Sequence, residues 1–107
     1  MISRIWHGWT SQTNADAYES LLRSEVLPGI AAKQIPGYTG AHVLRREVDP
    51  EVEFVTILWF ESLDSVRDFM GEDYEVAHVP PEAQALLARY DERSQHYDMR
   101  LTPEETQ

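Results

Sequence analysis

The hydrophobic and polar residues of this chain alternate in some segments and recur every three or four positions in others. Alternation rich in aromatic and β-branched residues predicts strands over 2–9, 38–47, 52–60 and 93–101. Spacings of three and four predict one helix capped by Thr13 or Asn14 and another that begins after Ser62 and ends at Gly71. The predicted order is therefore strand, helix, strand, strand, helix, strand.

Two proline-containing segments interrupt this pattern. Pro28 is expected to stop the first helix or to begin another turn, because proline lacks an N–H, and residues 28–33 are expected to form a second short helical piece. Pro80 and Pro81 open the segment 82–90, for which the sequence leaves two conformations open. One is a helix with proline at its first position, and the other is a partly extended lid.

The element order predicts an α+β fold of the ferredoxin-like βαββαβ type, with an antiparallel sheet and both helices on one face. The segment 52–60 is apolar on both of its faces, and Trp6 and Trp9 lie on opposite faces of the first strand. A sheet exposed to water on one side would instead alternate cleanly. We therefore expect a second copy of the chain to cover the other sheet face, which makes the protein a homodimer.

Length, charge and composition limit the number of domains and the classes of partner and cofactor that we expect. The 107 residues suffice for one domain, expected over 1–101, with a flexible polar tail over 102–107. Nineteen acidic against nine basic residues give a net charge of −10, so neither nucleic acid nor a membrane is an expected partner. The absence of cysteine excludes disulfides and thiolate catalysis, and a cytoplasmic location is the expectation in the absence of a signal peptide. No metal-binding or phosphate-binding motif is present, so we expect no metal and no cofactor.

Histidines and aromatic residues are the candidates for chemistry. His78 follows the second helix, and a neutral imidazole with a pKa near 6.5 suits proton abstraction from a phenol or an acidic carbon. The alternative is that His78 only hydrogen-bonds to the backbone of its loop. His7 lies between two tryptophans, and His96 shares a strand face with Asp98. A flat aromatic ligand would suit a cavity lined by aromatic residues, although such residues also serve as core. Tyr18, Tyr74 and Tyr97 are the tyrosines able to hydrogen-bond its oxygens.

Several short motifs over about residues 1–101 resemble the antibiotic biosynthesis monooxygenase domain of the dimeric α+β barrel superfamily. They are Ile5-Trp6, Pro36-Gly37-Tyr38, Val43-Leu44-Arg45-Arg46, Phe60-Glu61-Ser62, Val66-Arg67-Asp68-Phe69 and His96-Tyr97-Asp98. The resemblance implies a dimeric α+β barrel. It also implies a cofactor-independent monooxygenase for an aromatic or polyketide-like small molecule, with His78 as general base.

Other members of this superfamily suggest alternatives. In the haem-degrading members, a histidine after the second helix works with a tryptophan late in that helix, where this chain has Phe69. Those members also use an asparagine in the first strand, where this chain offers His7, Gly8 or Trp9. The plant-type polyketide cyclase resembles the Ala77-His78-Val79 run but has a tyrosine at the position of Phe69.

The residues and the resemblance together give His78 as the candidate catalytic residue. The candidate substrate-binding residues are Trp6, His7, Trp59, Phe69 and His96. A cyclase-like proton-transfer enzyme and a non-catalytic dimeric binding or structural module remain the alternative functions.

Overall fold

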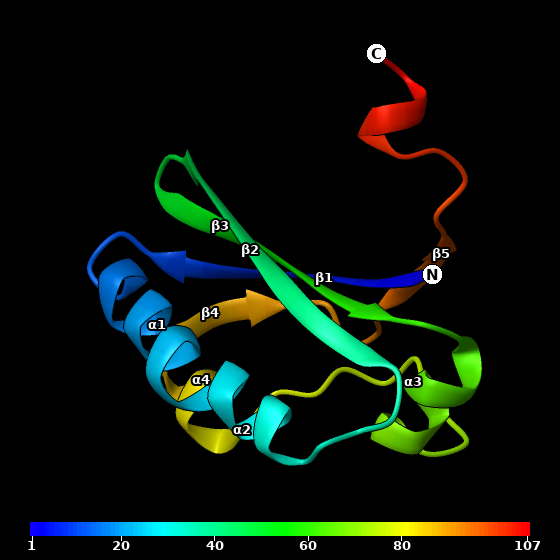
Figure 1. The fold of residues 1–107 in the computed structure, drawn as a ribbon. Helices are drawn as coiled ribbons and strands as arrows, with labels where there is room; N and C mark the ends of the chain where they lie inside the picture. The colour runs from blue at the N-terminus through cyan, green and yellow to red at the C-terminus, as the bar shows by residue number, and fades with distance from the viewer.

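A computed structural model describes all 107 residues. The strands are β1 (Ile2–Ser11), β2 (Tyr38–Val48), β3 (Glu51–Phe60), β4 (Leu87–Tyr90) and β5 (Gln95–Asp98). The helices are α1 (Ala15–Leu21), the π-helical segment η1 (Leu22–Val26), α2 (Leu27–Ala32), α3 (Leu63–Met70), α4 (Pro81–Leu86) and the 3-10 turn η2 (Pro103–Glu105). Figure 1 shows the helices of the domain gathered beneath a single twisted sheet.

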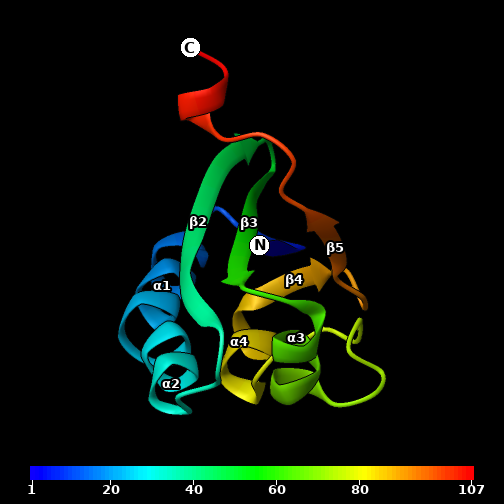
Figure 2. The same cartoon turned by 45° about the vertical axis from the view of Figure 1, so that its right-hand side comes forward.

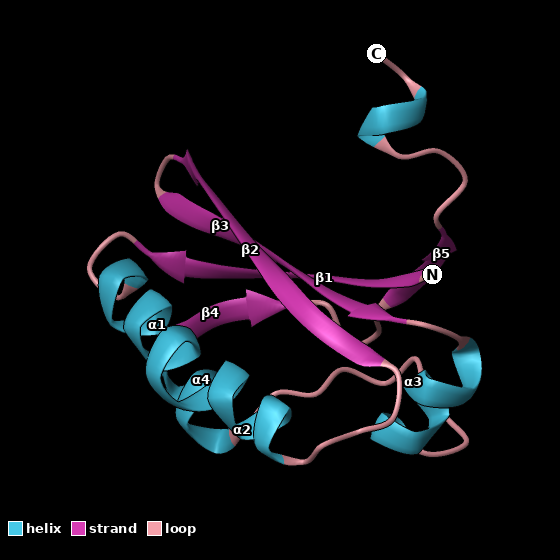
Figure 3. Cartoon of the chain, viewed as in Figure 1, coloured by secondary structure: helices cyan, strands magenta, loops and turns pink.

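The sheet has the strand order β2-β3-β1-β4, and β5 also pairs with β1. All of these pairings are antiparallel. β1 is the central strand because it pairs with β3 along its whole length on one side and with β4 and β5 on the other. Helices on one face of an antiparallel sheet in this order define the predicted ferredoxin-like α+β fold, which is confirmed (Figure 3).

The two faces of the sheet differ in what covers them. On β1, Ile2, Arg4 and Trp6 are buried beneath the helices, whereas His7 and Trp9 lie on the opposite face and are only partly buried. The helix side holds two hydrophobic clusters. One contains Trp6, Ala15, Tyr18, Leu22, Val52, Phe54 and Ala83, and the other contains Ile2, Ile30, Leu58, Phe60 and Val66. We call the opposite, uncovered side the open face.

The expectation that Pro28 stops the first helix is wrong. α1, η1 and α2 follow one another without a break, although residues 27–32 are helical as predicted. A proline removes one backbone hydrogen bond and crowds the carbonyl four residues earlier. The π-helical segment lies directly before this point, where the N–H of Leu27 bonds to the carbonyl of Leu22. The wider π turn accommodates the ring, so the helix continues to Ala32.

The last strand differs from its predicted bounds of 93–101. The helix predicted in 82–90 ends at Leu86, and Leu87–Tyr90 forms a strand, β4, that no pattern predicted. β4 and β5 both pair with β1, and a connection bulges out between them. This connection is tied to β1 because the Asp91 N–H donates to the His7 carbonyl at 3.0 Å. The fourth strand thus begins and ends earlier than predicted and is split in two.

The second predicted helix is confirmed as α3. The Ser62 side chain accepts a hydrogen bond from the backbone N–H of Ser65, which caps the first turn. Gly71 ends the helix with a φ of 90°, in the region that favours glycine. Beyond β5 the chain leaves the body of the molecule, as Figure 2 shows. The domain limits of 1–101 and the flexibility of 102–107 stay predictions.

Candidate functional site

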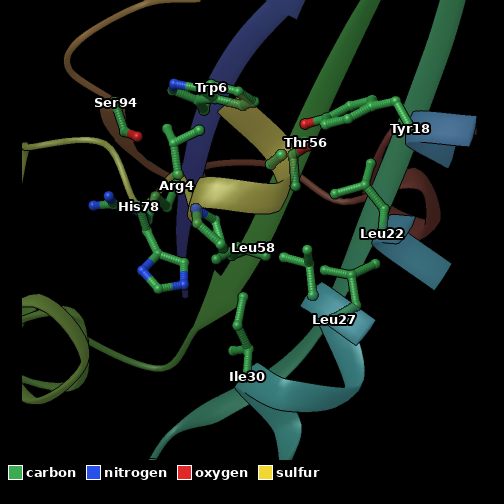
Figure 4. A pocket seen from close by; sticks show the side chains of 14 residues that line it. Arg4, Trp6, Tyr18, Leu22, Leu27, Ile30, Thr56, Leu58, His78 and Ser94 are labelled. Carbon is green, nitrogen blue, oxygen red and sulfur yellow. The ribbon is translucent and has the colours of Figure 1, made fainter. Parts of the chain in front are cut away.

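A cavity of about 50 Å³ lies between the helices and the sheet. Nine of its fourteen lining residues are hydrophobic. The lining residues are Arg4, Trp6, Tyr18, Leu22, Val26, Leu27, Ile30, Thr56, Leu58, His78, Val79, Pro80, Ala83 and Ser94. Figure 4 shows them converging from the sheet, from the long helix and from the segment that follows α3.

The strand alternation explains which sheet residues reach this cavity. Arg4 and Trp6 are two positions apart on β1, and Thr56 and Leu58 are two apart on β3, so each pair points to the helix side. The Trp6 indole Nε1–H donates to the Asp91 carbonyl at 2.7 Å. This bond fixes the ring as one wall of the cavity.

Arg4 is the most deeply buried charged group at the cavity, with 3% of its surface exposed. Its guanidinium donates to the carbonyls of Tyr74 and Val76. Burial lowers the pKa of Arg4 to about 10, against the opposing effect of the Glu75 carboxylate. Arg4 therefore keeps its charge at neutral pH, although it is removed from water.

His78 lies at the edge of the cavity and is exposed to water. Its ring meets the ring of Phe69 edge-on, with the centroids 5.3 Å apart. Partial burial lowers the pKa of His78, and the positive charges of Lys33 and Arg4 lower it further. The imidazole is therefore neutral at pH 7 and is able to accept a proton.

Three hydroxyl groups complete the polar part of the lining. Tyr18 is only 1% exposed, and its oxygen points toward Thr56 in Figure 4. Burial alone raises the pKa of Tyr18, so the hydroxyl stays protonated and able to donate. The hydroxyl of Thr56 is buried without a hydrogen-bond partner, and the buried Ser94 lies on the other side of the cavity. A buried hydroxyl without a partner is costly, so the Thr56 hydroxyl favours a polar ligand.

The structure brings some of the predicted site residues together. Trp6 and His78 both line the cavity. Phe69 lies behind His78, outside the lining, and carries Lys33 over its ring with the ammonium 5.2 Å from the centroid. His96 also lies outside the lining, with its Nε2 3.1 Å from Nη1 of Arg4. Phe69 and His96 thus support lining residues rather than forming the wall.

His7 and Trp59 lie on the open face, away from His78. The His7 ring bonds to the buried Glu53 carboxylate at 2.9 Å. Arg46 donates to the same carboxylate at 2.7 Å, and these two contacts lower the pKa of Glu53, Arg46 having the larger effect. The Trp59 indole donates to Nδ1 of His42 at 2.9 Å. Neither residue contributes to this cavity.

Sequence reasoning missed Arg4, Thr56 and Ser94 as cavity residues. The sequence does contain a signal for Arg4, because this arginine lies on the same strand face as Ile2 and Trp6 and interrupts their apolar row. Ser94 lies in the bulge between β4 and β5, and that bulge left no signal.

These features define an α+β protein with a ferredoxin-like sheet and a mostly apolar cavity beneath its helices. A crystal structure from Bacillus cereus, of a protein described as a "putative antibiotic biosynthesis monooxygenase", has the same fold. The two superimpose with a TM-score of 0.57, covering 94% of this chain and 91% of the other at 14% sequence identity. No protein-family model and no curated protein match the sequence. The likeness of the single chain's α+β fold to that of an antibiotic biosynthesis monooxygenase is therefore confirmed, whereas the dimeric barrel stays a prediction.

The helices are too short or too polar for a membrane span.

Proposed function

We propose that this protein is a cofactor-independent monooxygenase for a small aromatic molecule, with His78 as its general base. The observation that carries the proposal is a neutral histidine at the edge of an apolar cavity. The fold is shared with a protein described as a putative antibiotic biosynthesis monooxygenase, which supports a monooxygenase function.

The proposed chemistry begins with a proton transfer. His78 removes a proton from a phenol or an acidic carbon, and the electron-rich anion then reacts directly with molecular oxygen. For a hydroquinone, one oxygen atom enters the ring and the other leaves as water, and the product is a hydroxyquinone. The ring supplies all the electrons and both hydrogens of that water, so no further reductant is needed.

The volume of the cavity limits the size of the substrate. Its volume of about 50 Å³ is far below that of most ligand pockets, which span roughly 300–1,000 Å³. A single ring is therefore the largest body we expect the cavity to take, and further rings would have to remain outside it. Trp6 and Leu58 offer apolar contact to such a ring, and the Tyr18 hydroxyl is placed to orient an oxygen substituent.

The test measures oxygen uptake with hydroquinone as the probe, followed by mass spectrometry after reaction in oxygen-18 gas. A monooxygenase puts one labelled atom into the hydroxyquinone. His78→Ala should lower the rate by about a hundredfold or more, which is the usual contribution of a general base. His42→Ala is the matched control, because His42 lies on the open face and bonds to Trp59. Equal rates for the two variants would remove His78 from the mechanism.

Other outcomes select the alternatives. Exchange of an acidic C–H with deuterated water, without oxygen uptake, would indicate a cyclase-like proton-transfer enzyme that uses the same base. Binding without either reaction would indicate a non-catalytic module.

A further inference from the structure

Arg4 is a buried cation without an anionic partner. None of the nine ion pairs in the structure involves it, and its hydrogen bonds go to two carbonyls and to His96. A guanidinium can only donate, so Nε2 of His96 is the acceptor and the imidazole is neutral. Buried charges in proteins are normally paired, because the loss of hydration is otherwise uncompensated.

The surroundings of Arg4 leave this charge largely unbalanced. The cavity lining contains Arg4 and His78 but no aspartate or glutamate, in a chain whose net charge is −10. Lys33 adds a second positive charge beside Phe69. Glu75 acts on Arg4 from a distance, but its carboxylate lies 3.6 Å from the guanidinium of Arg93. The cavity is thus a positive region on an acidic protein, which favours an anionic ligand.

We propose that the cavity binds a small organic carboxylate, with its negative charge set against Arg4 and its apolar body among the hydrophobic lining residues. The Thr56 hydroxyl is buried without a partner, and burial keeps the Tyr18 hydroxyl protonated, so both groups can donate to carboxylate oxygens. The apolar majority of the lining disfavours a fully hydrated anion such as inorganic phosphate, since nothing would replace most of its hydration. The small volume limits the body to one ring.

This inference rests on the proposed function in taking the cavity as the substrate site, and it narrows the substrate to an aromatic acid. Its test is independent of turnover, because it measures binding alone. Oxygen uptake by a neutral hydroquinone without carboxylate binding would overturn this inference and leave the proposed function standing. Carboxylate binding without any oxygen uptake would support this inference and contradict the proposed monooxygenase function.

The experiment compares benzoate with benzamide, a neutral molecule of nearly the same shape. Binding to the wild-type protein is measured by calorimetry and by tryptophan fluorescence, to which Trp6 contributes from the cavity wall. Benzoate should bind about tenfold more tightly or better, since a buried charge pair is worth at least that factor. Equal affinities, or no binding of benzoate at millimolar concentration, would overturn the proposal.

Single substitutions test whether benzoate binds beside Arg4 in the cavity. Arg4→Met should abolish the preference for benzoate, whereas Arg23→Met, on the exposed face of the long helix, removes the same charge and should leave it intact. Arg4 also holds the carbonyls of Tyr74 and Val76, so its replacement risks misfolding. Tyr18→Phe avoids that risk, because its hydroxyl makes no bond to be lost. This variant should weaken benzoate binding several-fold while benzamide binding changes less, and an unchanged benzoate affinity would contradict the proposed pose.

Discussion

At the scale of single residues, two glycines should respond in opposite ways to the same substitution. Gly37 has a φ of 88°, and a Cβ at this position would lie 2.0 Å from the Ser65 hydroxyl oxygen. Gly29 lies in α2, where an added methyl group would meet nothing within 4 Å. Gly37→Ala should lower the free energy of unfolding by about 1–3 kcal/mol, through strain and overpacking. Gly29→Ala should raise it by about 0.5–1 kcal/mol through helix propensity. Urea denaturation of both variants checks this pair, and a stable Gly37→Ala would show that the turn relaxes.

His78 offers a second prediction at this scale, concerning pH. Its pKa lies below the ordinary 6.5 because of partial burial and the charges of Lys33 and Arg4. The base form is the unprotonated one, so activity should rise with pH through a midpoint below 6.5. Lys33→Gln removes a positive neighbour, makes protonation easier, and should move that midpoint to higher pH. A proton NMR titration of His78 gives the same shift without an activity assay, with Arg23→Gln as the control. If the midpoint of Lys33→Gln equalled that of the wild type, the charge of Lys33 would not be a cause of the lowered pKa of His78.

At the scale of elements, the cap of α3 should contribute measurably to stability. Ser62→Ala removes the acceptor for the Ser65 N–H and should cost about 1 kcal/mol. Ser24→Ala is a suitable control, because the Ser24 hydroxyl bonds only to the Ser20 carbonyl within its own helix. That replacement should be neutral or slightly stabilising. Thermal denaturation would distinguish the two, and equal melting temperatures would indicate that the Ser62 cap contributes little.

The elements also show where sequence reasoning reaches its limit. Strand alternation and the Ser62 cap were sufficient to predict β1, β2, β3 and α3, because those signals lie within each segment. The run around Leu87 has the composition of a helix, and only pairing with Thr10 and Gly8 of β1 makes it a strand. The site follows the same rule. His78 was predicted from its place after a helix, whereas the role of Arg4 depends on carbonyls 70 and 72 positions away.

At the scale of the whole molecule, the open face exposes apolar side chains that a partner surface would bury. Leu44 is 50% exposed on this face, beside partly buried Val55 and Trp59. The carboxylates of β3 there are already paired, Glu53 with His7 and Arg46 and Glu51 with Arg89, so these pairs need not be lost if the face is covered. The segment after β5 leaves the body of the molecule (Figure 2), and its Leu101 is 66% exposed, which adds a second apolar side chain for a partner to cover.

A second copy packed on the open face accounts for these features together, and we predict a homodimer at micromolar concentration. Leu44→Glu should shift sedimentation velocity to the monomer, because a twofold contact buries the new charge twice. Val76→Glu is the matched control, since Val76 is 40% exposed but lies in the loop after α3. The cavity lies on the helix side of the sheet, so Leu44→Glu should leave benzoate binding intact even as it separates the copies. A wild-type monomer would leave the apolar open face unexplained and refute the dimer. Loss of benzoate binding on dissociation would instead mean that the second copy supports the cavity.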